Sequence, residues 1–246
     1  RAKASGADAV KFQLWNPKNL KPGAWDNDGR RKLYLKSYLD YKKFKLLYRF
    51  SKKLGIECFG SVFSYQDLEI HKNINRRIIK IPSSEAYDFK LIKLALKYFS
   101  KVIVSTGALS SLELKRLYQI KTNKLILLHC VSSYPLDNKN INFYKFKFLM
   151  KKFKNVGYSG HAKGINDAIW AIANGACLIE KHFTVDNNLK GRDNKFSILP
   201  NELSKVVEFK NFHHDSNSKK TLNILKCEKD VVKNYRGRWR INEKVK

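Results

Sequence analysis

Two short segments of the chain each end an apolar run with ionisable side chains. Gly175–Thr184 places Glu180 and His182 after an apolar stretch, and Val156–His161 places His161 in the same way. An apolar strand belongs in the core, so its polar end is expected to open on a surface cleft. Two histidines and a carboxylate that meet there suit a divalent metal or acid–base chemistry. These strand ends therefore give the first indication of a chemical site.

The same polarity recurs at the end of almost every apolar run. The polar residues, in chain order, are Lys11, Gln13, Ser61, Lys80, Ser83, Ser105, Thr106, His129, Ser132, Ser133, Tyr134, Ser159, His161, Glu180 and His182. Lysine supplies positive charge, and hydroxyls and loop amides hydrogen-bond oxyanions, so the set suits a phosphate and a carboxylate. His129 precedes Cys130 inside a run, and we interpret it as a packed, hydrogen-bonded core residue.

These polar ends belong to a regular alternation of apolar runs and amphipathic segments. The runs predict strands at Ala9–Gln13, Ile56–Phe63, Ile78–Pro82, Val102–Thr106, Leu125–Cys130, Val156–Ser159 and Cys177–Phe183. Helical patterns lie between them, at residues 87–99, 110–120, 142–153 and 165–174. Such alternation predicts parallel strands joined by right-handed crossovers. Because polar residues gather at the strand ends, we favour a (β/α)8 TIM-type barrel over an open doubly wound sheet.

The visible strands are one fewer than a closed eight-stranded barrel needs. The chain opens with Arg1–Ala7, which resembles the end of a helix entering a strand, and its single methionine is Met150. We therefore expect the first strand and most of its helix to be missing ahead of residue 1. We predict a barrel domain over residues 1–212, incomplete at its N-terminus, followed by a basic C-terminal extension over residues 213–246.

Composition narrows the class of protein. The 246 residues are 43% hydrophobic and 13% aromatic, which is enough for one large folded domain. No apolar run approaches the length of a membrane span, and the four cysteines share no CxxC spacing, so we expect a reduced cytoplasmic protein. The net charge of +29 is scattered over predicted helices such as Leu35–Lys45. This scatter indicates solvated faces rather than a nucleic-acid groove.

Several blocks of sequence, taken together, resemble the sialic acid synthase family. They are Gly6–Gln13, Lys80–Ser83, Val104–Gly107, Leu127–Pro135, Tyr158–His161, Ile179–Thr184 and Gly191–Asp193. The resemblance runs from about Gly6 to about Val207, with the blocks in the family's order. It implies an α/β barrel enzyme that condenses phosphoenolpyruvate with an N-acylated amino sugar. The products are a nine-carbon 2-keto acid and phosphate, which leaves by C–O cleavage.

The resemblance also implies roles for individual residues. His161 and His182 would hold a divalent metal, Mn²⁺ or Mg²⁺, and Glu180, Lys80 and Lys11 would be catalytic. Phosphoenolpyruvate would be bound by Lys11, Ser61, Lys80, Ser83, Ser105, Ser132 and Ser159. The sugar, N-acetylmannosamine or a modified hexosamine, would contact Gln13, Tyr134 and Asp193. We further expect a homodimer.

The sequence also departs from the family. It lacks the Glu-Ile-Gly…Asn-His motif of the first strand, and we expect no C-terminal antifreeze-like domain after the short basic segment near Tyr235. Ser132 stands where sialate-forming members often carry asparagine, which leaves the acceptor sugar open. Two alternatives remain. One is another phosphate-binding barrel lyase or aldolase, with Lys80 or Lys181 forming a Schiff base. The other is a catalytically degenerate, basic family member with a binding role.

Overall fold

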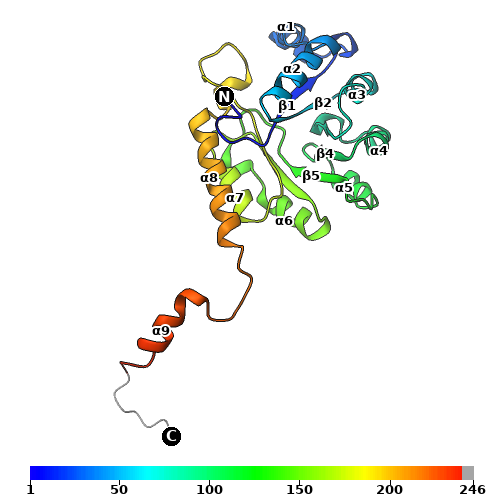
Figure 1. The fold of residues 1–246 in the computed structure, drawn as a ribbon. Coiled ribbons are helices and arrows are strands. Elements are labelled where there is room, and N and C mark those ends of the chain that lie inside the picture. The colour runs from blue at the N-terminus through cyan, green and yellow to red at the C-terminus, as the bar shows by residue number, and fades with distance from the viewer. Residues whose placement is uncertain (240–246) are drawn as a thin grey trace.

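A single parallel sheet forms the centre of the computed structural model, which describes residues 1–239 (Figure 1). The strands pair in sequence order, and every neighbouring pair is parallel. Their bounds are β1 Ala9–Leu14, β2 Glu57–Val62, β3 Ile78–Ile81, β4 Lys101–Ser105, β5 Leu125–His129, β6 Val156–Gly160 and β7 Ile179–Lys181. The seven predicted strands are confirmed, and each lies within about two residues of its predicted bounds.

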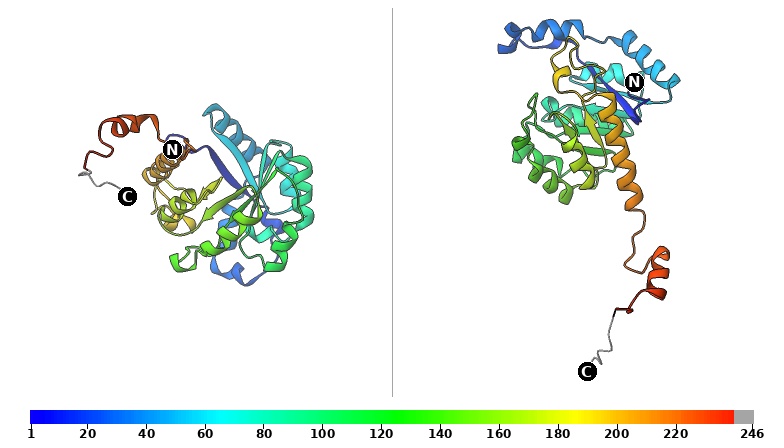
Figure 2. Two further views of the ribbon diagram at one scale, coloured as in Figure 1. Left: turned by 90° about the horizontal axis from the view of Figure 1, so that it is seen from below. Right: turned by 90° about the vertical axis from the view of Figure 1, so that its left-hand side faces the viewer.

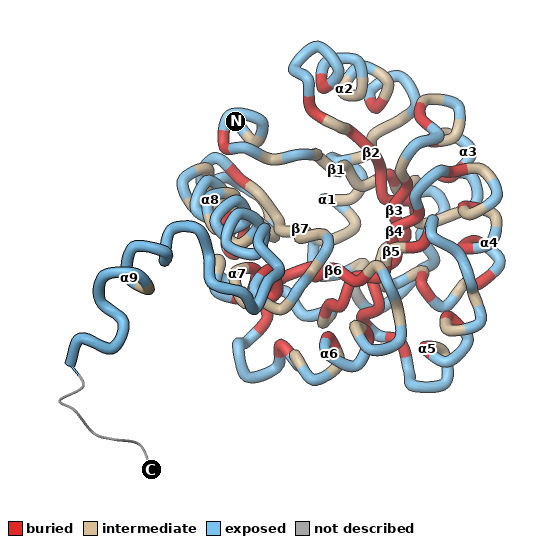
Figure 3. Tube along the Cα trace, turned by 60° about the horizontal axis from the view of Figure 1, so that its bottom comes forward, coloured by how far each residue is buried: buried red, intermediate tan, exposed pale blue. Residues whose placement is uncertain are grey.

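Most of the helices cover the outside of the curved sheet, whereas α1 lies at one end of the barrel and α9 stands clear of it (Figures 2 and 3). The α-helices are α1 Arg30–Lys36, α2 Tyr41–Lys53, α3 Tyr65–Lys72, α4 Phe89–Tyr98, α5 Ser111–Leu117, α6 Phe143–Lys152, α7 Asn166–Ala173, α8 Pro200–Ser216 and α9 Lys229–Asn234. Short 3-10 turns are η1 Pro17–Asn19, η2 Ala24–Asp28, η3 Ser83–Glu85, η4 Asn138–Asn140, η5 Asp193–Phe196 and η6 Lys226–Glu228. All four helical patterns predicted between strands correspond to helices of the structure.

The ring of strands is open between β1 and β7. Within residues 1–239, β1 pairs only with β2 and β7 only with β6, so the two strands are the edges of the sheet. This arrangement is a (β/α) barrel short of one strand. The predicted helix end at Arg1–Ala7 is confirmed by its hydrogen bonds, because Ser5 N donates to Arg1 O and Ala7 N donates to Ala2 O around Gly6, whose φ is +86°. The turn packs on α8, where Gly6 lies directly against Val207.

Local side-chain caps set where the helices begin. Ser110 accepts a bond from Glu113 N, and Glu113 in turn accepts from Ser110 N, so α5 starts with a capping box. The continuous helix expected across Leu35–Lys45 is wrong, since α1 ends at Lys36 and α2 begins at Tyr41. Asp40 causes this break, because its carboxylate caps α2 by accepting from Lys43 N.

Alternation along the strands sorts the core into two layers. Outward residues such as Val102, Val104, Ile79 and Ile81 join the main cluster under the helices. Inward residues Phe59, Ile103 and Leu128 form a small apolar cluster inside the ring. The inward positions nearer the strand ends are polar, and they include Ser61, Lys80, Ser105 and Ser159. The apolar plug therefore supports a polar layer at the carboxyl end of the barrel, which we call the rim.

The C-terminal segment leaves the barrel on the side away from the rim (Figures 1 and 2). The predicted domain boundary at residue 212 falls inside α8, and the division into two domains stays a prediction. Part of the predicted basic extension, residues 240–246, lies outside the described residues. No helix within residues 1–239 combines the length and the apolar character needed to cross a membrane.

Candidate active site at the carboxyl ends of the strands

A carboxylate between two lysines forms the centre of the rim. Glu180 on β7 places Oε1 3.0 Å from Lys11 Nζ and 3.8 Å from Lys80 Nζ. Ser159 Oγ donates to the same oxygen at 3.0 Å. Lys80 is 2% exposed, and its ammonium donates to Ser105 Oγ at 2.7 Å. Residues from five strands, predicted separately from strand ends, thus meet at one point.

The charges at this centre shift the pKa values of their neighbours. Burial lowers the pKa of Lys80 to about 8, and the nearby Glu180 carboxylate only partly opposes this. Burial alone would raise the pKa of Glu180, but the ammonium groups of Lys11 and Lys80 outweigh it and hold that pKa well below its usual range. Glu180 is therefore ionised at neutral pH. The centre accordingly offers two cations around one anion, which leaves positive charge for an anionic ligand.

The two predicted histidines lie side by side, with ring centroids 5.6 Å apart. His161 Nδ1 lies 2.8 Å from Val131 O; a carbonyl only accepts, so the proton is on Nδ1 and Nε2 keeps its lone pair. Burial lowers the pKa of His161 to about 4, and burial together with the Lys11 charge lowers that of His182 to about 3. Both imidazoles are neutral at pH 7, the form that binds metals.

The two predicted histidines would supply only two of the ligands that a bound cation needs. No group of three His, Cys, Asp or Glu side chains within residues 1–239 could hold a metal ion. Asp193 Oδ2 faces His182 Nδ1 at 3.6 Å, where it can orient the ring. Mg²⁺ and Mn²⁺ prefer oxygen ligands, and Mg²⁺ usually keeps several waters and takes further oxygens from its substrate. His161 and His182 would therefore supply two nitrogen ligands, and water and substrate oxygens would supply the rest.

Aromatic and hydroxyl groups form a second part of the rim. The centroid of the Tyr134 ring lies 4.3 Å from that of the His161 ring and 6.2 Å from that of the His182 ring. Ser83 Oγ and Ser132 Oγ are 2.7 Å apart, joining the ends of β3 and β5. Burial, more than any neighbouring charge, raises the pKa of Tyr134 to about 12, so its hydroxyl keeps its proton. These groups offer hydrogen bonds beside the histidines.

The remaining predicted residues extend the rim along β1 and β2. Gln13 lies directly opposite Ser61 in the register of β1 and β2, and Ser61 lies opposite Lys80 in that of β2 and β3. Ser61 is fully buried, and its hydroxyl has no hydrogen-bond partner among residues 1–239. An unpaired buried hydroxyl is costly and calls for an explanation. It points into the same layer as Lys80.

Consecutive residues of a strand point to opposite faces of the sheet, so neighbours in the sequence lie in different surroundings. His129 faces outward, where Nε2 donates to Ile141 O at 2.8 Å, so its interpretation as a core residue is confirmed. Cys130, the next residue, faces the rim, where its thiol contacts Ser105 and lies near Lys80. The sequence interpretation missed Cys130 as a rim residue, although alternation with His129 was the available signal. Lys181 faces away from Glu180, onto α7, where it pairs with Asp167 at 3.0 Å.

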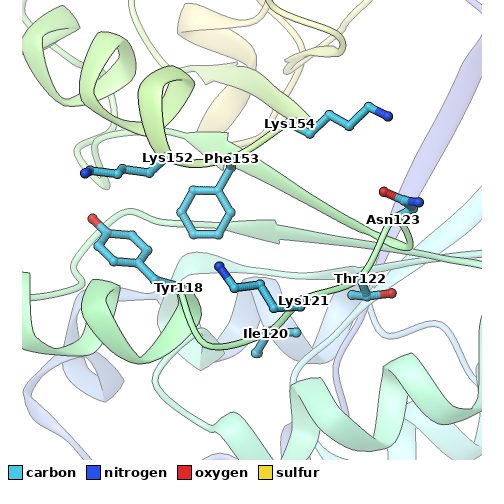
Figure 4. A pocket seen from close by; sticks show the side chains of 8 residues that line it. All are labelled: Tyr118, Ile120, Lys121, Thr122, Asn123, Lys152, Phe153 and Lys154. Carbon is cyan, nitrogen blue, oxygen red and sulfur yellow. The ribbon is translucent and has the colours of Figure 1, made fainter.

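A surface hollow of about 350 Å³ lies at the opposite end of the barrel (Figure 4). Its lining comes from the segments that precede β5 and β6, namely Tyr118, Ile120, Lys121, Thr122, Asn123, Lys152, Phe153 and Lys154. None of the predicted site residues belongs to it. The chemistry of the chain is therefore concentrated at the rim and not in this hollow.

Comparison with known proteins agrees with this arrangement. The model of the NeuB family matches residues 1–220. The chain belongs to the NeuB family. A curated relative, the N,N'-diacetyllegionaminic acid synthase of Campylobacter jejuni, is 35% identical over 218 residues, which covers 81% of this chain and 65% of that protein. The N-acetylneuraminate-9-phosphate synthase of Drosophila melanogaster is 33% identical, covering 84% of this chain and 60% of that protein.

Solved structures extend the comparison to the fold of this NeuB-family chain. The N-acetylneuraminic acid synthetase of Leptospira borgpetersenii superposes with a TM-score of 0.84 at 33% identity, covering 94% of this chain and 82% of that one. A DAHP synthase of Thermotoga maritima has a TM-score of 0.66 at 18% identity, which shows a shared fold alone. The chain spans 65% of the length of the first curated relatives it matches.

Proposed function

We propose that this chain condenses phosphoenolpyruvate with an N-acylated amino sugar, forming a nonulosonic acid and releasing phosphate. The observation that carries this proposal is the centre of the rim, where Lys11 and Lys80 flank the ionised Glu180. Related proteins are named as legionaminic, pseudaminic and N-acetylneuraminate synthases, which supports the same class of reaction. The acceptor is a hexosamine of unspecified modification.

Phosphoenolpyruvate carries a carboxylate and a phosphate, and the rim offers matching groups for both. Lys11 and Lys80 supply two cations, and the hydroxyls of Ser61 and Ser105 lie on the strands beside Lys80. The further hydroxyls assigned to this ligand are those of Ser83, Ser132 and Ser159. A bound oxyanion would give the buried Ser61 hydroxyl the acceptor that it lacks among residues 1–239.

The sugar is assigned to Tyr134 and Asp193 beside the histidines and to Gln13 on β1. Tyr134 and Gln13 offer hydrogen bonds to hydroxyl and amide groups, and Asp193 adds a carboxylate beside His182. His161 and His182 would hold Mn²⁺ or Mg²⁺, and the bound ion would polarise the sugar aldehyde as a Lewis acid. The two rings lie next to Tyr134, so the ion and the aldehyde would share this part of the rim.

In the reaction, the π electrons between C2 and C3 of phosphoenolpyruvate form the new bond to the sugar aldehyde carbon. Water adds to C2, and one of its protons passes to the ionised Glu180 Oε1. Because the pKa of Glu180 is low, this proton is passed on to the aldehyde oxygen, which becomes a hydroxyl. The C2–O bond to phosphate then breaks, the C2 hydroxyl becomes the ketone, and its proton leaves with the phosphate. Lys11 and Lys80 balance the phosphate charge.

Phosphate release from phosphoenolpyruvate tests this proposal directly. The purified protein is incubated with a panel of N-acyl hexosamines, with Mn²⁺ or with a chelator. We expect release with at least one sugar and none after chelation. No turnover with any sugar, or turnover that is indifferent to metal, contradicts the proposal. Light scattering on the same sample tests the expected homodimer.

A Schiff-base aldolase is the second candidate, and one observation favours it. Lys80 is buried with a pKa lowered to about 8, which makes a neutral, nucleophilic amine accessible near neutral pH. Borohydride added with a carbonyl substrate separates the two functions. Trapping of the substrate on Lys80, with activity that survives chelation, would favour the aldolase. Lys181 is a poorer candidate, because its ammonium is held by Asp167 outside the rim.

A further inference from the structure

The side chain of Lys181 joins the two segments that carry the histidines. On β7, Glu180 points into the rim, so Lys181 points the opposite way, into the layer between the barrel and α7. Its Nζ donates to Ala162 O at 2.8 Å, and Ala162 directly follows His161. Lys181 itself directly precedes His182. One ammonium therefore connects the backbone next to each histidine.

The connection is saturated with hydrogen bonds. Lys181 Nζ also donates to Asp167 Oδ1 at 3.1 Å and to Oδ2 at 3.0 Å, so its three protons have three acceptors. Asp167 accepts further bonds from Tyr158 OH at 3.1 Å and from Ala168 N at 2.8 Å. The side chains of Lys181 and Asp167 are 4% and 1% exposed. A buried polar network whose members are all satisfied holds one geometry.

The backbone next to the pair is adapted to it. Gly160 immediately precedes His161, and a Cβ at this position would lie 2.3 Å from Asp167 Oδ2 and 2.9 Å from Lys181 Cδ. Only glycine leaves room for the ion pair against the end of β6. The network thus fits closely beneath the peptide that carries His161.

We propose that Lys181 and Asp167 are positioning residues, which set the spacing of His161 and His182 for a divalent cation. This inference rests on the metal assignment of the proposed function. The pair touches neither the rim nor any proposed substrate group, and it acts through the two backbone segments. A buried ion pair contributes little net stability compared with uncharged groups of similar shape, so a role in geometry accounts for this pair better than a role in stability.

The test replaces both charges while keeping the shapes, as Lys181→Met with Asp167→Asn. Asn retains an acceptor for Tyr158, and no unpaired buried charge is left. Mn²⁺ binding is measured by isothermal titration calorimetry or by the EPR signal of free Mn²⁺. We expect affinity to fall on the order of tenfold, the effect typical of groups that orient metal ligands. Thermal unfolding and metal-free binding of phosphoenolpyruvate should stay close to wild type.

A control removes a more exposed ion pair at the other end of the barrel, whose side chains are 74% and 22% exposed. Arg77 and Glu57 lie 3.1 Å apart before β3 and at the start of β2, and Arg77→Met with Glu57→Gln should leave Mn²⁺ affinity unchanged. If the double variant at Lys181 and Asp167 fails to fold, Tyr158→Phe removes one bond of the network and should weaken Mn²⁺ binding in the same direction.

The outcomes separate this inference from the proposed function. Wild-type protein that binds no Mn²⁺ overturns the metal assignment and the positioning role together. Wild-type binding that the network variants match overturns the positioning role alone. Weaker Mn²⁺ binding in the folded network variants, with the control unchanged, supports it.

Discussion

Replacing Lys80 by methionine should raise the free energy of unfolding and at the same time weaken the binding of phosphoenolpyruvate. Lys80 is 2% exposed, and its pKa falls from 10.5 to about 8, chiefly because burial penalises the ammonium. Methionine has a similar length and no charge, so it fills the same space without that penalty. Glu180 would keep Lys11 and Ser159 as partners, so the change leaves no unpaired carboxylate.

The pKa of Lys80 sets the size of the effect. Its fall from 10.5 to about 8 means that charging the folded state costs about 3 kcal/mol at pH 7, because one pKa unit is worth about 1.4 kcal/mol. The lost hydrogen bond to Ser105 offsets about 1 kcal/mol of this. The free energy of unfolding of Lys80→Met should therefore exceed that of wild type by about 2 kcal/mol at pH 7.

The difference in stability between Lys80→Met and wild type should depend on pH, in the way expected for a lysine whose pKa is lowered. Between pH 8 and 10.5 the unfolded wild-type chain binds more protons at Lys80 than the folded chain does, so wild-type stability gains with rising pH from this group. Below pH 8 the penalty is fully present, and toward pH 10.5 it disappears. The advantage of Lys80→Met should shrink across this window.

Urea unfolding of both proteins from pH 7 to pH 10 measures the difference, and Lys101→Met serves as the control. Lys101 is exposed at the start of β4, so its replacement should change little. Phosphoenolpyruvate should bind Lys80→Met at least about tenfold more weakly, because a charged hydrogen bond is lost. A variant less stable than wild type at pH 7, or a difference that is constant with pH, refutes the reasoning.

Three further substitutions test other parts of the rim. Glu180→Gln should lower turnover by about 10² or more, as expected for a group that handles a proton, while binding of phosphoenolpyruvate persists; unchanged turnover in rapid-mix assays contradicts this. His182→Ala should remove Mn²⁺ binding in calorimetry and leave the thermal midpoint nearly unchanged, because the side chain is 25% exposed. Ser61→Ala should raise the free energy of unfolding by about 1 kcal/mol, since its buried hydroxyl is unpaired within residues 1–239, and should weaken binding of phosphoenolpyruvate. A destabilised Ser61→Ala protein would mean that the hydroxyl has a partner in the folded state.

Most of the fold could be predicted from the pattern of apolar residues, because each strand is a short apolar run that ends in polar residues. It predicted β3, β4 and β5 almost to the residue, and it placed Lys80 and Ser105 at neighbouring strand ends, where their side chains meet at 2.7 Å. Such local signals depend only on residues that are close in sequence. For this reason, the residues of the rim could be predicted from the sequence alone.

The parts that were not predicted depend on contacts between distant residues. The segment between β1 and α2 has no strand–helix pattern, and it is held by Trp15, whose Nε1 donates to Tyr34 O and whose ring contacts that of Phe63. The network of Lys181 and Asp167 was not predicted for the same reason, because the sequence indicated Lys181 only as a possible Schiff-base lysine. Lys181 lies on the opposite face of β7 from Glu180, and this placement could be recognised only once the strand register was known.

The opening between β1 and β7 lies directly beside the centre of the rim. Backbone groups on the outer edges of Ala9–Leu14 and Ile179–Lys181 have no strand partner within residues 1–239. A strand that paired with both edges would close the ring next to Lys11 and Glu180, which these two strands carry. Closure of the ring would therefore shield this ion pair from solvent and strengthen its electrostatic interaction.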